Sequence, residues 1–485
     1  MSSEEKDPLY EVSFDTLEDP EDPLALSDLR KWLIVGLISC GSICITSISS
    51  IWSLVSPSIM EEYHISQEVS TLGISFYIWG MGTGGMFLSP ISEFHGRKIV
   101  YVSGLFLVFA FGLVPAFSHN IGSILFSRAI AGFFSSSFMS VAGGTFSDLF
   151  KKTERTANFK RDQQKELNKA LLMYSVSPFF GAGLGPIIAG AVVQYLPYRW
   201  AFYIMSIWSG VMTLLVIVFV PETYEPVLLK KKAARLRKST GDDRYFAPIE
   251  KIKQSLVRSI FLSSKRPILL ILKDYMTMAL CFYSGFVLAV IYLFFVSFPY
   301  TFRTVYHFNS LGQGLAFIGL ILGLCLTAII SPPFIKIWYD HLMAKNNGVH
   351  VTEFRLLPLI IGAFLTPIGL FILAWTSYPH VHWIAPIIGS FVFGAGTSLV
   401  FSGIFAYTVE AYRKYTASAM ATNSFVRSMM SGAFPLFGLQ MYKALGIQWA
   451  TTILAVFSCF LIPIPFIFYK YGAMLRAKSP YTWSD

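Results

Sequence analysis

Apolar runs long enough to cross a bilayer recur along this chain from Trp32 to Tyr469. A transmembrane helix needs roughly twenty apolar residues to cross a hydrocarbon core about 30 Å thick, and each run has about that length. Proline and glycine inside the runs are compatible with helix, because membrane helices tolerate both. The approximate spans are 32–55, 70–90, 99–117, 122–146, 170–195, 200–220, 275–298, 311–334, 354–376, 383–408, 418–441 and 447–469. The sequence therefore predicts an all-α membrane protein with twelve transmembrane helices.

The composition argues against most soluble classes of protein. The chain is 54% hydrophobic and 14% charged, whereas soluble domains are about 45–50% apolar and about 25% charged. A soluble enzyme or a nucleic-acid-binding module needs more polar surface than these residues supply. The formal net charge of +10 is compatible with a nucleic-acid partner only if the cations lie where nucleic acid can reach them.

The positions of the basic residues give the chain two sides. If the N-terminus is cytosolic, 33 of the 38 lysines and arginines fall in the termini and in the loops on that side. The other five are Arg128, Arg199, Arg303, Arg427 and Lys443. The positive-inside rule then predicts both termini in the cytosol, and we expect no nucleic-acid partner. The run Lys230-Lys231-Lys232 is interpreted as a solvated orienting segment rather than a lipid site.

Two groups of six spans flank a basic centre. The expected parts are an acidic, disordered cytosolic tail over 1–29 without a cleavable signal, a six-helix bundle over 30–221, a basic cytosolic loop over 222–274, a second bundle over 275–470 and a cytosolic tail over 471–485. Asp148 after span four and Glu410 after span ten each begin an acid, apolar, aromatic, basic, basic sequence. Ser89-Pro90 and Ser331-Pro332 also correspond. We expect two pseudo-symmetric halves with a binding site between them near the membrane midplane.

Charged residues gather in the short loop after span two. Glu93, Arg97 and Lys98 lie there around Gly96, and Arg97 could bridge to Glu93 and to Asp148 on the neighbouring span four. Such a bridge would have to break when an inner gate opens. The alternative interpretation is that these residues only cap helix ends and orient the chain.

The same loop carries a family resemblance. Residues 89–98 resemble the loop signature G-x-x-x-D-x-x-G-R-[KR] of the major facilitator superfamily, with Ser89 and Glu93 in place of its Gly and Asp. Arg128 with Gly132 is similar to the fourth-helix motif of that superfamily. Membership implies the major facilitator fold, in which two six-helix bundles alternate access to a site between them.

Two further segments narrow the resemblance. Gly181, Gly185, Pro186 and Gly190 resemble the antiporter motif G-x-x-x-G-P-x-x-G-G, which this superfamily associates with exporters, although Ala189 replaces a glycine. Residues 221–229 are similar to the P-E-[TS]-Y-x-P-V-[LI]-L signature of fungal twelve-span drug:proton antiporters, a group that includes polyamine and multidrug exporters. The implied function is proton-coupled export of amphiphilic drugs, xenobiotics or organic cations. A polyamine or metabolite transporter, including an importer, is the alternative.

Few residues can carry a proton, because no Asp or Glu lies inside a predicted span and the histidines lie outside the spans or at their edges. The acids at helix ends are Glu93, Asp148, Asp274 and Glu410. A carboxylate that titrates near neutral pH needs burial or a partner. We therefore expect Asp148 and Glu410, with Glu93, Arg97 and Arg128, to couple and gate transport. The alternative is that the end charges are structural and coupling lies elsewhere.

The interior offers aromatic and small polar groups to a substrate. The candidate contacts are Trp52, Tyr174, Tyr283, Tyr292, Asn423 and Arg427. Aromatic faces bind flat apolar compounds and organic cations, and without a buried anion they suit amphiphilic drugs better than polyamines. Ordinary helix packing is the alternative role for each residue.

Other functions fit the sequence less well. An intramembrane enzyme would need paired aspartates, clustered histidines or a buried nucleophile with a base, and the spans contain none of these. A non-transporting sensor would be expected to have a long receptor-like tail. The five cysteines lie in apolar stretches, so we interpret them as packing residues and expect no metal site and no cofactor beyond the proton gradient. We expect a monomer in the plasma membrane, with the vacuolar membrane as the alternative.

Overall fold

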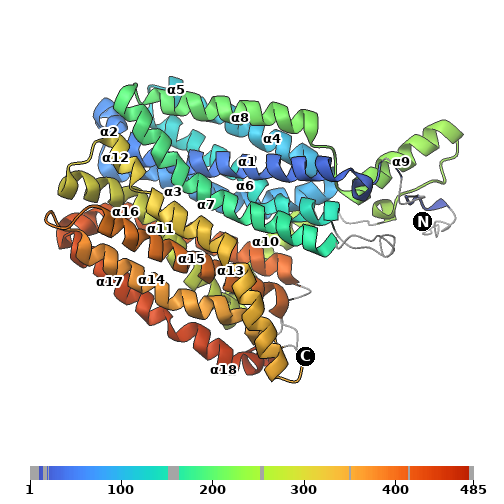
Figure 1. Cartoon of the computed structure of the whole chain (residues 1–485). Helices are drawn as coiled ribbons and strands as arrows, with labels where there is room; N and C mark the ends of the chain where they lie inside the picture. The colour runs from blue at the N-terminus through green and yellow to red at the C-terminus, as the bar shows by residue number, and fades with distance from the viewer. Residues whose placement is uncertain are drawn as a thin grey trace.

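The chain folds as two helical bundles that lie side by side. The computed structural model describes residues 10–14, 19, 21–150, 163–251, 256–348, 351–412 and 415–479. The first bundle, blue to green in Figure 1, lies against the second, yellow to red. The basic pairs 151–152 and 413–414, which follow Asp148 and Glu410, lie outside the described residues.

The first bundle contains the helices that the first six apolar runs predict. They are α1 (Asp28–Ser50), α2 (Trp52–Tyr63), α3 (Gln67–His95), α4 (Arg97–Gly112), α5 (Val114–Phe117), α6 (Ile121–Phe150), α7 (Gln163–Tyr195) and α8 (Arg199–Phe219). Spans one and three are each divided into two helices. Pro115 lies just after the second break, where its missing N–H leaves no helical hydrogen bond unmade.

The second bundle repeats the arrangement. Its elements are α11 (Tyr275–Tyr306), α12 (Ser310–Leu315), α13 (Ile318–Lys345), η5 (Thr352–Leu356), α14 (Leu357–Thr376), α15 (Ile384–Ala411), α16 (Thr416–Leu445), α17 (Ile447–Leu461) and α18 (Pro463–Lys478). Here spans eight and twelve are divided. The all-α prediction is confirmed for the described part of the chain.

Ten helical segments of the described chain are long and apolar enough to cross a membrane. Of the twelve predicted spans, the two below this hydropathy limit are α3 and α16, which pack on each other between the bundles. Their small and polar residues explain both facts: a Cβ added at Gly82 of α3 would lie 2.4 Å from the Cβ of Ser428 on α16. Small residues permit close backbone approach and lower the mean hydropathy of the helix.

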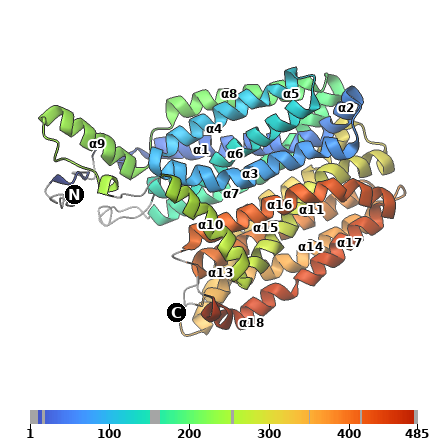
Figure 2. The same ribbon diagram turned by 180° about the vertical axis from the view of Figure 1, so that it is seen from behind.

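The segment between the bundles contains α9 (Glu225–Thr240), η4 (Pro248–Lys251) and α10 (Leu256–Lys273). Figure 1 shows α9 projecting from one end of the molecule, and Figure 2 shows the same projection from behind. Both the first and the last described segments lie at that end, which we call the near end; the opposite end is the far end. Helix α10 contacts α3, α11 and α16, so it joins the two bundles.

Part of the N-terminal segment, which the sequence predicts to be disordered, has defined contacts. Val12 and Phe14 are buried against Leu229, Ala233 and Ala247 of the central segment. The ammonium group of Lys232 lies 2.9 Å from the Asp19 carboxylate. An acidic tail and a basic segment attract each other through charge, and apolar residues between the charges can then be buried.

Candidate functional site

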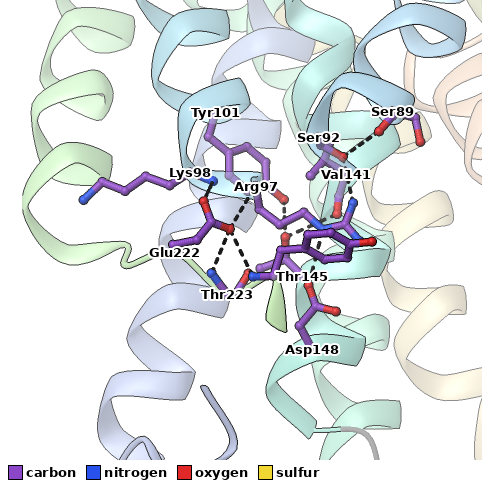
Figure 3. A network of polar contacts seen from close by, with 11 residues as sticks. Ser89, Ser92, Arg97, Lys98, Tyr101, Val141, Thr145, Asp148, Glu222 and Thr223 are labelled. Carbon is purple, nitrogen blue, oxygen red and sulfur yellow. Dashed lines mark hydrogen bonds and ion pairs between the residues drawn. The ribbon is translucent and has the colours of Figure 1, made fainter. Parts of the chain in front are cut away.

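A network of polar contacts at the near end joins four helices of the first bundle (Figure 3). Arg97 is the first residue of α4, and its Nε donates to the carboxylate of Asp148 on α6 at 3.3 Å. Its Nη1 donates to the hydroxyl of Ser92 on α3 at 2.7 Å. A Cβ at Gly144 of α6 would lie 2.7 Å from Nη2, so glycine there leaves room for the guanidinium. The structure thus contains the Arg97–Asp148 contact that the sequence predicts.

Glu222, which the sequence analysis did not select, completes this network. Its carboxylate accepts the backbone N–H groups of Arg97 at 2.7 Å and Lys98 at 3.2 Å. It also accepts those of Thr223 and Tyr224, both at 3.0 Å. The first N–H groups of a helix have no partner within the helix, and a carboxylate there also stabilises the helix dipole. Glu222 therefore connects the end of α8 to the start of α4. The one sign of a role for Glu222 in the sequence is its position in the 221–229 signature.

Tyr224 adds an aromatic ring to the network, next to Arg97. The guanidinium carbon of Arg97 lies 4.7 Å from the centre of its ring. Burial raises the pKa of the Tyr224 phenol, and Glu93 adds to this effect while Arg97 opposes it. The phenol therefore stays neutral at physiological pH. Glu93 itself is exposed, and Arg97 uses Asp148, Ser92 and Tyr224 as its partners rather than Glu93.

The second bundle has a matching pair at the near end. Nε of Arg355 in η5 lies 2.8 Å from the carboxylate of Glu410 near the end of α15. Arg355 lies at the start of span nine and Arg97 just before span three, while their partners lie just after spans ten and four. The repeat predicted from Asp148 and Glu410 therefore extends to their cationic partners. The Glu410 pair is more open than the first, because the Arg355 side chain is 44% exposed and that of Arg97 only 10%.

Asp274 forms a more deeply buried cluster in the second bundle. It precedes α11 and is 4% exposed. Its carboxylate accepts the hydroxyl of Thr277 at 2.5 Å and the hydroxyl of Tyr412. The sequence predicts Asp274 at a helix end but favours Glu410 as a proton carrier. Tyr412, two residues after Glu410, gave no sign in the sequence of pointing to a segment 138 residues away.

Arg128 lies inside the first bundle and is 2% exposed. Its guanidinium donates to the carbonyl oxygens of Ile48 at 2.7 Å, Ser49 at 3.1 Å and Gly73 at 3.0 Å. Ile48 and Ser49 end α1, where carbonyl groups lack helical partners and carry the negative end of the helix dipole. The guanidinium also lies over the rings of Trp52 and Tyr77. These contacts give Arg128 a packing role at the α1–α2 break.

Arg427 of α16 has different surroundings. Its side chain is half-buried, and its guanidinium carbon lies 5.4 Å and 5.5 Å from the ring centres of Phe401 and Phe405 on α15. Phe401 in turn stacks on Phe179 of α7 in the first bundle, with ring centres 5.6 Å apart. The sequence analysis missed these rings, although Phe401 and Phe405 are four residues apart and therefore share one helix face. Arg427 thus lies at the boundary between the bundles.

Three of the other candidate substrate residues lie inside a single bundle, away from the boundary. Trp52 is fully buried in the first bundle and donates to the carbonyl oxygen of Ser70 at 2.8 Å. Tyr283 is fully buried in the second, with its hydroxyl toward Thr366 of α14. The structure therefore does not bring these two to the boundary. Asn423 is also buried within the second bundle, where it donates to Ser284 at 2.7 Å.

Two candidate tyrosines remain close to the boundary. The hydroxyl of Tyr292 lies 3.2 Å from that of Ser49 on α1 and so joins the two bundles. Tyr174 of α7 is half-buried and donates to the carbonyl oxygen of Phe138 at 2.5 Å. Both are electrostatic neighbours of Arg427. The boundary site therefore consists of Arg427, Tyr174 and Tyr292 with the phenylalanine rings.

The glycine motif of α7 has two faces. A Cβ at Gly181 or Gly185 would lie 2.1 Å from a hydroxyl oxygen of α1, that of Thr46 or Ser50. A Cβ at Gly190 would lie 2.5 Å from the carbonyl oxygen of Ser310 in the other bundle. A Cβ at Gly314 of α12 would similarly lie 2.6 Å from the Pro186 carbonyl oxygen. The motif thus packs α7 against its own bundle and against the partner bundle.

Polar contacts also join the bundles at the far end. Gln440 of α16 donates to the Glu68 carboxylate of α3 at 2.6 Å, and Lys443 donates to the side-chain carbonyl of Gln67 at 3.2 Å. The backbone N–H of Ser310 donates to the side-chain carbonyl of Gln194 at 3.2 Å. The far side of the molecule is therefore closed in this conformation. Within the described residues, no group of three or more His, Cys, Asp and Glu side chains is placed to hold a metal ion.

Comparison with known proteins agrees with this arrangement. The family profile described as Major Facilitator Superfamily matches residues 37–435. The solved structure of the xylose transporter XylE from E. coli, described as partially occluded and inward open, is similar in fold, with a TM-score of 0.61. The match covers 91% of this chain and 99% of that one at 15% sequence identity, so it concerns the fold alone.

Curated relatives are similar over almost the whole chain. One is the "Probable drug/proton antiporter YHK8" of Saccharomyces cerevisiae, 48% identical over 480 residues, or 98% of this chain and 91% of that protein. "Efflux pump atB" of Aspergillus terreus is 40% identical, over 97% of this chain and 89% of its own. The "Major facilitator superfamily multidrug transporter mdrA" of Aspergillus fumigatus is 34% identical, over 99% and 77% respectively.

Proposed function

Because the chain belongs to the Major Facilitator Superfamily, we propose that it is a proton-coupled antiporter that exports amphiphilic drugs and xenobiotics by alternating access. Names such as drug/proton antiporter and efflux pump among the relatives support export. The observation that carries the proposal is the boundary site, where the half-buried Arg427 faces aromatic rings while the far side is closed. In six-plus-six transporters the substrate site lies at this boundary.

The proton route in this proposal runs through the near-end carboxylates. Asp148 and Glu410 are the proposed carriers, with Glu93, Arg97 and Arg128 as coupling and gating residues. Protonation of Asp148 would remove the negative charge that attracts Arg97 at 3.3 Å. Arg97 would then hold α6 less firmly, and the near-end junction of α3, α4, α6 and α8 could loosen. The exposed position of Glu93 and the carbonyl partners of Arg128 give these two residues less support than Asp148 has.

Transport by the reconstituted protein under an imposed pH gradient tests the proposal. Labelled amphiphilic drugs should accumulate in proteoliposomes, and an ionophore that collapses the gradient should abolish accumulation. Asp148→Asn should reduce gradient-driven accumulation by about tenfold or more and leave drug binding unchanged, because the amide neither ionises nor carries a proton. Asp242→Asn, on the exposed loop after α9, is the matched control. Accumulation that persists without the gradient would rule out antiport.

The alternative is a polyamine or metabolite transporter on the same fold, which could be an importer. The absence of Asp and Glu from the predicted spans disfavours polyamines, because a polycation needs a compensating anion in its site. The α7 motif favours export through its resemblance to exporters. Measuring uptake of labelled spermine and of the drug panel in the same vesicles, with the protein in each orientation, distinguishes these cases.

For the cellular setting, we propose a monomer in the plasma membrane with both termini in the cytosol. The vacuolar membrane is the alternative. The excess of lysine and arginine on the near side supports this orientation. Modification of an added cysteine next to Asp242 by an impermeant reagent should require permeabilised cells, whereas one next to Glu68 should react in intact cells if the plasma membrane is the location.

A further inference from the structure

The membrane interior of this chain holds positive charge without negative charge. Arg128 and Arg427 lie within the predicted spans, and none of the described residues in those spans is Asp or Glu. A buried charge needs compensation from a counter-ion, dipoles or water. How each arginine is compensated therefore indicates what the interior can bind.

Arg128 is compensated by the protein itself. Three carbonyl oxygens accept from its guanidinium, two aromatic rings lie beside it and its side chain is almost fully buried. The cavity beside it has room for only about one water molecule, so an amphiphilic ligand does not fit there.

Arg427 is compensated only in part. No described side chain or carbonyl oxygen accepts a hydrogen bond from its guanidinium, and its Nε is buried without a partner. Its neighbours are the ring faces of Phe401 and Phe405 and the phenols of Tyr174 and Tyr292, all uncharged. Arg427 as a whole is nevertheless half-buried rather than fully enclosed. It lies over Phe401, which stacks on Phe179 of the first bundle, so the exposed part of the residue is at the boundary between the bundles.

We propose that Arg427 binds the carboxylate of an amphiphilic organic acid, and that the anion supplies its missing counter-charge. The planar fork of a guanidinium matches the two oxygens of a carboxylate. Phe405 and Phe179, which are half-buried and both stack on the buried Phe401, offer ring surface to the apolar body of the same molecule. An organic cation would instead meet an uncompensated like charge in a medium of low dielectric constant. This inference rests on the proposed export function and narrows its substrate class from amphiphilic compounds in general to amphiphilic organic anions.

A charge series on one molecular body tests the proposal. 4-Butylbenzoate, 4-butylbenzamide and 4-butylbenzamidinium have almost the same shape and differ by one charge at each step. Equilibrium dialysis of the labelled compounds against the full-length protein in nanodiscs gives the three dissociation constants. We expect the benzoate to bind about tenfold or more tightly than the amide, and the amidinium to bind more weakly than the amide.

Three substitutions assign the effect to the arginine. Arg427→Met should weaken benzoate binding by about tenfold or more while amide binding changes less than about twofold, and Arg427→Lys should recover part of the loss. Phe405→Leu should weaken the benzoate and the amide alike. Arg303→Met, at an exposed site near the far end of α11, changes the net charge equally and should leave all three constants unchanged.

The wild-type series alone can overturn the proposal, so it stays testable even if Arg427→Met does not fold. Equal or tighter binding of the amidinium would show that the site does not select anions. Unchanged benzoate binding to a folded Arg427→Met would show that another group binds the carboxylate. If drugs of another charge are exported under a pH gradient while benzoate does not bind, the anion inference fails and the export function stands. If no compound is transported at all, the export function itself fails.

Discussion

At the residue scale, the near-end network depends on the close approach of Glu222 to Gly96. Four backbone N–H groups converge on this one carboxylate, so it holds the start of α4 and the end of α8 in a single geometry. Arg97 extends the arrangement to α3 and α6 through Ser92 and Asp148. Gly96 lies between the two sets of contacts, with φ of +102°.

Gly96→Ala should destabilise the first bundle. Its backbone conformation is one that L side chains rarely adopt, and the new Cβ would lie 2.1 Å from the Glu222 carboxylate. We expect the free energy of unfolding to fall by about 1–3 kcal/mol, seen as a lower unfolding temperature of the purified protein. Gly36→Ala is the control, because nothing lies within 4 Å of its added Cβ. Equal unfolding temperatures for the two variants would contradict the prediction.

At the element scale, α7 packs both within its own bundle and against the other bundle, which has to move relative to it during transport. Its two sets of glycines face different neighbours: Gly181 and Gly185 meet α1 of the same bundle, while Gly183 and Gly190 meet the other bundle. Close contacts of the first set hold a bundle together throughout the transport cycle. Those of the second set lie between the bundles, so alternating access requires them to separate when the far side opens.

Substitutions on the two faces of α7 should therefore have different effects. In Gly185→Ala the Cβ would lie 2.5 Å from the Ser47 carbonyl oxygen of α1, so the unfolding free energy should fall by about 1–3 kcal/mol. In Gly183→Ala the Cβ would overlap Ile321 across the boundary. That variant should unfold near the wild-type temperature but transport more slowly, because it disfavours the far-closed conformation. Gly143→Ala, with open space around its Cβ, should change neither measurement. Parallel losses of stability in both α7 variants would contradict the distinction.

The elements themselves could largely be predicted from the sequence. Hydropathy is a local property, so the expected span 383–408 agrees with α15 (Ile384–Ala411) to within three residues at either end. Contacts between distant segments could not be predicted in the same way. Glu410 pairs with Arg355, which is 55 residues away, and no local pattern distinguishes this pairing from others. Phe14 belongs to the tail that the sequence predicts to be disordered. Nothing near it in sequence shows that Leu229 and Ala233 lie beside it.

At the scale of the whole molecule, the bundles are joined in the middle and at the far end. Ser75 of α3 donates to the carbonyl oxygen of Gly432 on α16 at 2.6 Å, and Tyr292 meets Ser49. The contacts of Glu68 and Gln67 with α16 lie beyond these, toward the far end. Alternating access requires the far-end contacts to separate once in each cycle, while contacts within one bundle can persist.

Cross-linking at the far end tests this requirement. In a protein with Glu68→Cys and Gln440→Cys, a short cleavable bis-thiol reagent should join the bundles, because the native side chains are 2.6 Å apart. The native cysteines are buried or half-buried, so the reagent should favour the introduced pair. Transport should fall by about tenfold or more on cross-linking and return on cleavage, while ligand binding from the near side should persist.

The matched control is a cross-link of similar reach within one bundle. Glu62 and Arg199 also lie near the far end, with carboxylate and guanidinium 2.5 Å apart, but both belong to the first bundle. Joining Glu62→Cys to Arg199→Cys should leave transport unchanged if each bundle moves as a rigid body. A fall in both proteins would mean that the bundles deform internally. Full transport by the cross-linked Glu68–Gln440 variant would mean that the far end does not separate during the cycle.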